Sequence, residues 1–338
     1  MPNLPMTRPT LPRPVRLRST RAQAEPEAVP VVPRQVITAA GLRWISIERP
    51  TQSDGEWLRE QFDFHALDME DVFSRNQRAK LDVYDDYLFL VIQFPVYEKV
   101  RRRLVSAELD VFIGPDYLIT LPNLPIPPVE ALFERFSERD DLREAAFARG
   151  SGYLLYRIID ACVDASFPML RKMGLKLDQL EDDIFEQERS SEIVRELNDL
   201  KQEIIAFRRI VRPQRTVFRD LERTKSRYLH AEDEIEVYFD DISDAAARIW
   251  DILENYKEVI DALEATNESV LSHRLNDSIR ILTGFSVMLL PLTLIASIWG
   301  MNVPVPGADA GLAFPALLVL MAALLGLFII VFRKRGWL

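Results

Sequence analysis

Residues 281–302 read ILTGFSVMLLPLTLIASIWGMN, and this stretch decides the architecture of the chain. From Ile281 to Trp299 it carries no charge and is mostly apolar. A helix of that length rises about 1.5 Å per residue and covers roughly 28 Å, close to the hydrocarbon thickness of a bilayer. A second apolar run, Leu312 to Phe332, would cover roughly 31 Å. The two runs predict a pair of transmembrane helices joined by an external loop at 303–311.

The charges around the two runs predict their orientation. Between Ile281 and Phe332 the only charged residue is Asp309, which lies in the loop where water can solvate it. Basic residues precede the first run and follow the second: Arg274, Arg280, Arg333, Lys334 and Arg335. Because basic flanks stay on the cytoplasmic side, both termini, including the basic tail 333–338, are expected in the cytoplasm. The chain is therefore predicted to be a multi-pass protein of the cell (plasma or inner) membrane.

The segment before the first span predicts one long helix that continues into it. No proline occurs between Pro213 and Pro291. A helix from about Tyr238 to Trp299 would be roughly 90 Å long, so it must run from the cytoplasm into the membrane. Its apolar positions recur at alternating steps of four and three, which predicts a buried seam against partner helices. The seam consists of Ile242, Ala246, Ile249, Leu253, Tyr256, Ile260, Leu263, the polar Asn267 and Val270.

Residues 35–150 are predicted to form an α+β cytoplasmic domain, and residues 151–275 a cytoplasmic helical region. The expected strands are Val36–Thr38, Leu42–Ile47, Tyr87–Phe94, Leu104–Ile113 and Tyr117–Leu121. Gly114, Pro115 and Asp116 form a turn signal that predicts a hairpin between the last two strands. Helices are expected at Ser53–Phe62 and, as one or two segments, within Pro127–Ala148.

The composition narrows the functional classes. A formal net charge of -10 over 338 residues argues against a nucleic-acid partner and favours cations. The one cysteine, Cys162, allows no intramolecular disulfide. The sequence has no phosphate-loop pattern, no Cys/His zinc cluster and no catalytic constellation, so an enzyme is not predicted. Residues 1–34 contain eight prolines and several arginines without an apolar core, which predicts a disordered tail.

A single helical hairpin has no interior, so a polar path through the membrane requires an oligomer. One stripe of the first span carries amide, hydroxyl and apolar side chains at alternating steps of three and four: Asn276, Ile279, Thr283, Ser286, Leu290, Thr293 and Ser297. Such a stripe is compatible with a polar path and equally with close helix packing, which Ser and Thr favour in membranes. The spacing alone leaves both interpretations open.

Gly300, Met301 and Asn302, placed directly after the first of two C-terminal spans, resemble the CorA family of divalent-cation (magnesium and cobalt) transporters within the CorA/ZntB-like superfamily. Further residues sit where that family has them: Pro291-Leu292-Thr293, Asn276 at the inner end of the span, and the basic ending Arg333-Lys334-Arg335-Gly336-Trp337-Leu338. The likeness covers roughly residues 36–338. It implies a funnel-shaped homopentamer whose pore is lined by residues 276–302, with Mg²⁺ both transported and regulatory, and no organic cofactor.

The resemblance makes Gly300, Met301 and Asn302 the selectivity filter. Mg²⁺ gives up its water reluctantly, so a ring of five Asn302 carbonyl oxygens would bind the hydrated ion rather than strip it. Gly300 would permit a tight exit from the helix. Deeper in the pore, Ile279, Leu282 and Leu290 are candidate hydrophobic constrictions, and Leu282 and Thr283 are alternatives for facing the axis.

The resemblance also implies a regulatory Mg²⁺ site between neighbouring subunits. Glu70 and Asp71 match one half of that site, and Asp241 matches the half that a neighbour supplies. Asp160 and Asp164, one helical turn apart, are alternatives for completing it. Facing carboxylates repel, and a divalent ion converts that repulsion into a bridge. The competing interpretation is that each acidic run is a solvated helix face.

Departures from the family pattern leave the identity of the transported ion open. The outer loop contains Pro306-Gly307, which is similar to the zinc-transporting ZntB branch. Ser297 stands where many members have Gly, and Ile279 stands where some have Met. The intact Met301 favours the magnesium branch. A passive, Mg²⁺-gated channel, which could also pass Co²⁺ or Ni²⁺, is the preferred hypothesis. A zinc transporter, with or without proton coupling, and a membrane-anchored protein without transport activity are the alternatives.

Overall fold

The computed structural model describes residues 34–74, 78–98, 103–184, 190–224, 235–301 and 312–335, and the structural statements below concern these residues. The expected tail at 1–34 lies outside them except for Arg34. Asn302, the loop 303–311 and residues 336–338 also lie outside the described residues.

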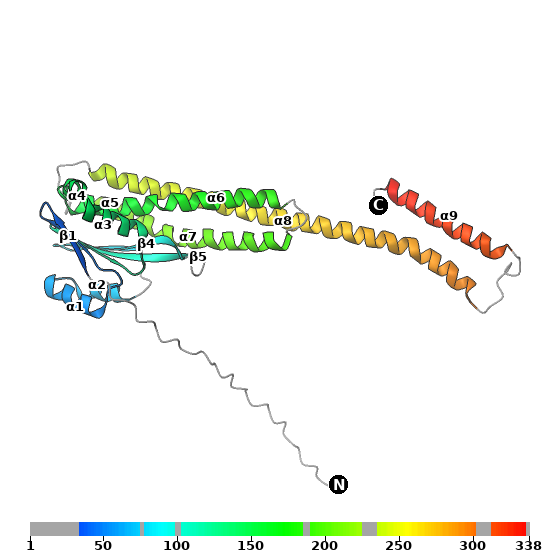
Figure 1. Ribbon diagram of the computed structural model, residues 1–338, viewed down its shortest axis with the longest axis horizontal. Helices are drawn as coiled ribbons and strands as arrows, with labels where there is room; N and C mark the ends of the chain where they lie inside the picture. Colours follow the sequence, from blue (N-terminus) through cyan, green and yellow to red (C-terminus); the bar gives the residue numbers. More distant parts are fainter. Residues whose placement is uncertain are drawn as a thin grey trace, which may run out of the picture. The chain divides into compact units, whose positions relative to one another are not determined.

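The N-terminal part of the described chain contains a six-stranded mixed β-sheet (Figure 1). Its strands lie in the order β1-β2-β6-β5-β4-β3. β2 pairs with β6 in parallel, and the other neighbouring strands pair antiparallel. The strands are β1 Gln35–Ala39, β2 Leu42–Ser46, β3 Lys80–Val83, β4 Leu88–Glu98, β5 Arg103–Ile113 and β6 Tyr117–Pro122.

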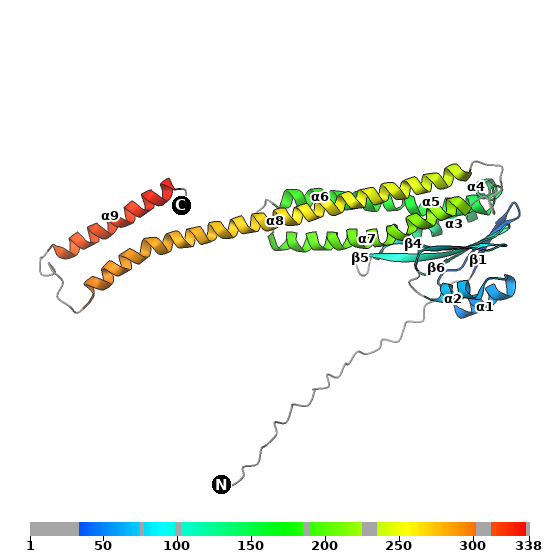
Figure 2. The same ribbon diagram turned by 180° about the vertical axis from the view of Figure 1, so that it is seen from behind.

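Helices cover both faces of the sheet, which explains why β4 and β5 are apolar on both sides. On one face, Phe89 and Phe112 are fully buried in a core shared with Leu58 of α1 and Met69 of α2. The opposite face contributes to a larger core that continues into the helical region. Figures 1 and 2 show the two layers from opposite sides. The covering helices are α1 Gln52–Gln61 and α2 Ala66–Phe73 on one side, and α3 Pro127–Glu138, α4 Asp140–Phe147 and α5 Ser151–Asp164 on the other. A later helix, α7 Ser190–Thr224, also contacts β3, β4 and β5.

The predicted hairpin is confirmed. β5 and β6 pair antiparallel, and the Gly114 N–H donates a hydrogen bond of 3.0 Å to the Tyr117 carbonyl oxygen. The strand β3 and the helix α2 were not predicted. Both are short: β3 has 4 residues with no burial alternation, and α2 has 8. Their positions are set by pairing with β4 and by packing on the sheet, which local sequence patterns do not encode.

The predicted helical region is present as α6 Ser166–Asp183, α7 Ser190–Thr224 and α8 Ile235–Trp299, following α5. The predicted seam on α8 is confirmed: Leu253 and Ile260 have no exposed surface, and Asn267 is 6% exposed. α6 approaches α8 so closely that a Cβ on Gly174 would lie 2.5 Å from the Tyr256 hydroxyl oxygen. The seam therefore stabilises α8 against α5, α6 and α7 within one chain.

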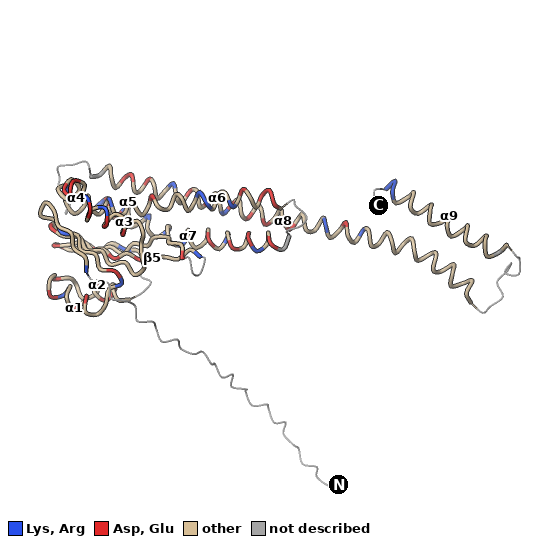
Figure 3. The backbone as a smooth tube through the Cα atoms, in the orientation of Figure 1, with Lys and Arg blue, Asp and Glu red and all other residues tan. Residues whose placement is uncertain are grey.

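α8 has 65 residues and spans about 98 Å at 1.5 Å per residue. Charged residues stop partway along it, and the remainder and most of α9 (Ala313–Lys334) are uncharged (Figure 3). Windows of 18 residues in the two helices reach mean hydropathies of 2.1 and 2.8, so both are apolar and long enough to cross a membrane. The Arg280 guanidinium donates to the Arg335 carbonyl oxygen at 3.3 Å, so the start of the apolar part of α8 lies beside the end of α9. The two helices form an antiparallel hairpin.

Candidate functional site

The predicted stripe on α8 lies on one face of the helix and is exposed along its length. Its members are Asn276, Ile279, Thr283, Ser286, Leu290, Thr293 and Ser297. Gly284 and Met288 are buried in the same stretch, where α9 contacts α8. At 100° per residue these buried positions lie about half a turn from the stripe. The stripe therefore faces away from α9, and it is available to other copies of the chain or to a pore.

Two hydroxyl groups on the stripe, those of Ser286 and Thr293, donate to their own helix. The Ser286 hydroxyl lies 2.9 Å from the Leu282 carbonyl oxygen, and the Thr293 hydroxyl lies 2.8 Å from that of Leu289. Donation to the preceding turn uses the hydroxyl hydrogen and leaves the oxygen lone pairs facing outward. The stripe consequently presents hydrogen-bond acceptors, which match the outward-pointing hydrogens of a hydrated cation.

α8 ends at the predicted filter tripeptide. The Gly300 N–H donates to the Ala296 carbonyl oxygen at 3.0 Å and closes the last turn. A Cβ at position 300 would lie 3.2 Å from that same oxygen, so any larger residue would crowd the turn. Met301 follows with 58% of its surface exposed. The filter residue Asn302 lies outside the described residues, and its role stays a prediction.

Three of the predicted regulatory carboxylates come together in one chain. Asp160 and Asp164 lie on α5 and Asp241 lies on α8, and these helices are in contact. Burial raises the pKa of Asp160, the negative charges of Asp164 and Asp241 raise it further, and the positive charge of Arg157 opposes the rise. Burial followed by the charges of Asp160 and Asp241 also raises the pKa of Tyr156 to about 12. Three carboxylates face one guanidinium, that of Arg157, so this surface keeps an excess of negative charge that a further cation would neutralise.

Glu70 and Asp71 lie on α2, where Glu70 is exposed and Asp71 is half-buried. The Asp71 carboxylate forms an ion pair of 2.6 Å with the Lys80 ammonium group at the start of β3. Within the described ranges, no three His, Cys, Asp or Glu side chains are arranged to hold a metal ion directly. An ion at Asp71 would therefore need ligands from a second subunit, or contacts through its own water.

Asp68, in the same acidic run, has a structural role. It is 1% exposed and accepts hydrogen bonds from the Tyr87 hydroxyl at 2.7 Å and the Tyr84 hydroxyl at 3.0 Å. These bonds hold α2 against the segment that leads into β4. Burial raises the pKa of Asp68 even though both hydroxyls favour its charged form. Sequence reasoning did not separate Asp68 from its exposed neighbours, although its position one turn before Val72, also buried, is an amphipathic signal.

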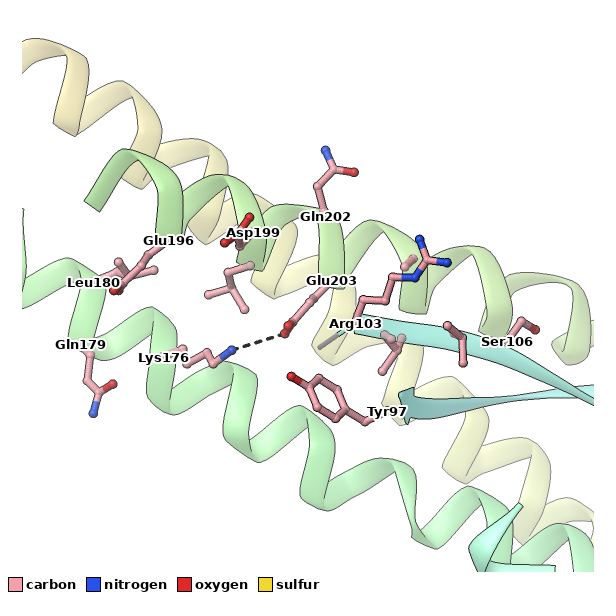
Figure 4. A pocket seen from close by; sticks show the side chains of 14 residues that line it. Tyr97, Arg103, Ser106, Lys176, Gln179, Leu180, Glu196, Asp199, Gln202 and Glu203 are labelled. Atoms are coloured by element: carbon pink, nitrogen blue, oxygen red, sulfur yellow. Dashed lines mark ion pairs between the residues drawn. The ribbon is translucent and has the colours of Figure 1, made fainter. Parts of the chain in front are cut away.

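A separate pocket of about 1060 Å³ lies between α6, α7 and the ends of β4 and β5 (Figure 4). Its lining carries both charges: the Lys176 ammonium lies 3.6 Å from the Glu203 carboxylate, and Arg103 lies nearby. None of the predicted site residues lines it. Because the opposite charges compensate each other across the pocket, we assign it no part in ion transport.

Comparisons with known proteins agree on one family. Residues 39–334 match the family model described as CorA-like Mg²⁺ transporter protein. The putative metal ion transporter YfjQ of Bacillus subtilis is 30% identical over 87% of this chain and 89% of its own length. The cobalt/magnesium transport protein CorA of Thermotoga maritima is 27% identical over 87% of this chain and 83% of its own length. The zinc transport protein ZntB of Pectobacterium atrosepticum is more distant, with 24% identity over 59% of this chain and 60% of its own length.

Among solved structures, the CorA magnesium transporter of Methanocaldococcus jannaschii superimposes with a TM-score of 0.75 at 21% identity. The match covers 88% of this chain and 92% of that one. At this identity the likeness establishes the shared fold, which includes the α/β domain and two C-terminal apolar helices.

Proposed function

Because the chain belongs to the CorA-like Mg²⁺ transporter family, we propose that it forms a homopentameric channel that conducts Mg²⁺ passively and closes when Mg²⁺ binds. Divalent-cation transport in a membrane is what membership of the family itself supports, and the family is not an enzyme class. The ion preference, the pentamer, the cytoplasmic position of both termini and the gating are the proposed parts.

The observation that carries the proposal is the exposed stripe of α8. Although the Ser286 and Thr293 hydroxyl hydrogens bond within the helix, a polar stripe facing lipid would leave the Asn276 amide and the outward lone pairs of the hydroxyl oxygens without partners, which is costly in hydrocarbon. Around a fivefold axis the same stripes would enclose a path whose oxygen lone pairs point inward. Ile279 and Leu290, which are 51% and 66% exposed, would then form rings that close the path by excluding water.

A stripe of acceptors suits an ion that keeps its hydration shell. Mg²⁺ demands near-ideal octahedral geometry and dehydrates reluctantly, so neutral oxygens that bind its water are better suited than a cage of carboxylates. Asn302, two residues beyond the last turn of α8, would supply the corresponding ring at the outer mouth. Co²⁺ and Ni²⁺ are candidates for the same route.

The regulatory part of the proposal places Mg²⁺ between Asp71 of one subunit and Asp241 of the next. The charge concentrated at Asp160, Asp164 and Asp241 supports a cation on that surface. An ion that binds only the closed, symmetric ring stabilises that ring by mass action. When the site empties, repulsion between the carboxylates would shift the population toward open or asymmetric states.

Zinc uptake is the second candidate, and the loop that contains Pro306-Gly307 favours it. The greater distance of the ZntB relative weighs against it. A membrane anchor without transport is the remaining alternative, and such a protein needs no ring of subunits.

Cysteine substitution tests whether the stripe lines the pore. Cys162 is 2% exposed and burial raises the pKa of its thiol, so it should not react with water-soluble reagents. In liposomes that contain the Ser286→Cys protein, a cationic thiosulfonate reagent should lower Mg²⁺ flux about tenfold, because the attached charge repels the permeating ion.

The matched control is Phe285→Cys. Phe285 is adjacent in sequence but about 100° around the helix, and it is 53% exposed. The reagent should leave its flux unchanged. Block of the Phe285→Cys protein together with insensitivity of the Ser286→Cys protein would mean that a different face of α8 lines the path.

A further inference from the structure

Lys80, the first residue of β3, lies between two carboxylates of one chain. Its Nζ atom is 2.6 Å from Asp71 Oδ2 of α2, and it forms a second ion pair with Asp82 of β3. The side chains of Lys80 and Asp71 are 31% and 22% exposed, so the pair is partly shielded from solvent. Burial lowers the pKa of Lys80, but the hydrogen bonds to Asp71 and Asp82 more than offset this and raise it overall.

Negative charge exceeds positive charge around this lysine. Asp110 of β5 is 3% exposed, and its Oδ1 atom has no hydrogen-bond partner in the described part of the chain. Burial raises the pKa of Asp110, the charges of Glu108 and Asp71 raise it further, and Lys80 alone opposes the rise. The lysine also lies 5.2 Å from the centre of the Phe89 ring. The positive charge of Lys80 therefore partly neutralises several acidic groups at once.

The Asp71 carboxylate that pairs with Lys80 is the one that, in the proposed function, binds the regulatory ion. A divalent cation and an ammonium group on the same carboxylate repel each other. At a separation of about 5 Å in a water-like dielectric, that repulsion changes a binding constant roughly tenfold. Because Lys80 keeps its ion pair with Asp82 when it leaves Asp71, the exchange costs one of its two ion pairs rather than both.

We propose that Lys80 is an internal competitor of the regulatory divalent cation: its ammonium group occupies Asp71 when the cation is absent and must withdraw toward Asp82 when the cation binds. The inference rests on the proposed regulatory role of Asp71. It assigns Lys80 the function of setting the cation concentration at which the site fills. It also gives Asp71 a partner in the empty state, so that the ring of subunits retains part of its stability without the ion.

The test is Mg²⁺-dependent protection of the full-length protein from a protease, measured with Mg²⁺ alone. The Lys80→Met variant should reach half-maximal protection at a Mg²⁺ concentration roughly tenfold lower than the wild type, since the competing charge is gone. The Lys80→Arg variant, which keeps the charge, should stay close to the wild type. A matched control is Lys201→Met, because Lys201 also bridges two carboxylates, Glu264 at 2.5 Å and Asp261 at 3.3 Å, away from Asp71. Its half-protecting concentration should not change.

A second variant acts in the opposite direction and remains informative if Lys80→Met does not fold. Asp82→Asn removes the alternative partner of Lys80, so more Mg²⁺ should be needed to displace the lysine from Asp71. In the Lys80→Met background the same Asp82 change should have little effect, because the lysine is no longer there to be displaced.

An unchanged or higher half-protecting concentration in a folded Lys80→Met protein would overturn the competition, and a higher one would mean that Lys80 positions Asp71 for the ion. A different result is expected if Asp71 and Asp241 do not form a regulatory site at all. In that case the wild type shows no Mg²⁺ protection, or protection survives Asp241→Ala.

Discussion

The Asn302→Ala protein is expected to assemble normally and to conduct no Mg²⁺ above background. The substitution removes the only carbonyl side chain of the tripeptide that ends α8 and leaves Gly300, which closes the last turn, in place. The contacts that hold α8, from Ile242 to Leu263, lie far from it along the helix. In the proposed pentamer the substitution would remove one ring of acceptors at the point of ion entry, so it should affect flux and leave folding unchanged.

Flux into proteoliposomes and the size of the purified oligomer should be measured on the same preparation. Asp309→Ala is the matched control, since it removes a polar side chain from the segment that follows the tripeptide without touching the tripeptide itself. Its flux should fall by no more than about twofold at physiological ionic strength, where salt screens an exposed charge. Near-normal flux through a correctly assembled Asn302→Ala protein would refute the filter assignment.

Asp241→Ala should remove most of the protection that Mg²⁺ gives the α/β domain and the adjoining helices against protease. The side chain is exposed on α8 and adds to the negative charge around Asp160. Without it, a bridging ion loses its charged ligand from one subunit, and the stabilisation that depends on binding is lost with it. Flux that depends on Asn302 should persist, because the pore is unchanged.

The matched control for this experiment is Asp182→Ala. Asp182 is an exposed carboxylate on α6, in the acidic run 181–183 that we interpret as a solvated face. Protection by Mg²⁺ should match that of the wild type. If Asp241→Ala and wild type are protected equally, the carboxylates of α5 and α8 are also a solvated face, and gating must depend on other residues.

Periodicity and length predicted the parts of the fold that extend over many residues. The long helix was placed at about Tyr238 to Trp299, and α8 runs from Ile235 to Trp299. Its seam could be predicted because a buried stripe repeats many times along one helix. By contrast, β3 has only 4 residues, and its register, which sets Lys80 opposite Val91, comes from pairing with β4. No local pattern carries that information.

The candidate site also contains residues that sequence patterns predicted and residues that only the folded structure reveals. The face that holds Thr283, Ser286 and Thr293 followed from spacing, and the structure adds the direction of the Ser286 and Thr293 hydroxyl bonds. The resemblance named Asp160 and Asp241, and tertiary packing of α5 on α8 explains why they influence each other. The ion pair of Asp71 with Lys80 joins α2 to β3, neither of which was predicted. Sequence reasoning therefore missed Lys80, because the pairing of β3 with β4 is what places it beside Asp71.

Ion uptake into proteoliposomes that contain the wild-type protein, compared for Mg²⁺ and Zn²⁺ with and without a pH gradient, tests the central claim most directly. The account predicts Mg²⁺ uptake that follows the ion gradient and is indifferent to the pH gradient. Zinc uptake that requires the pH gradient, with no uptake of Mg²⁺, would contradict it.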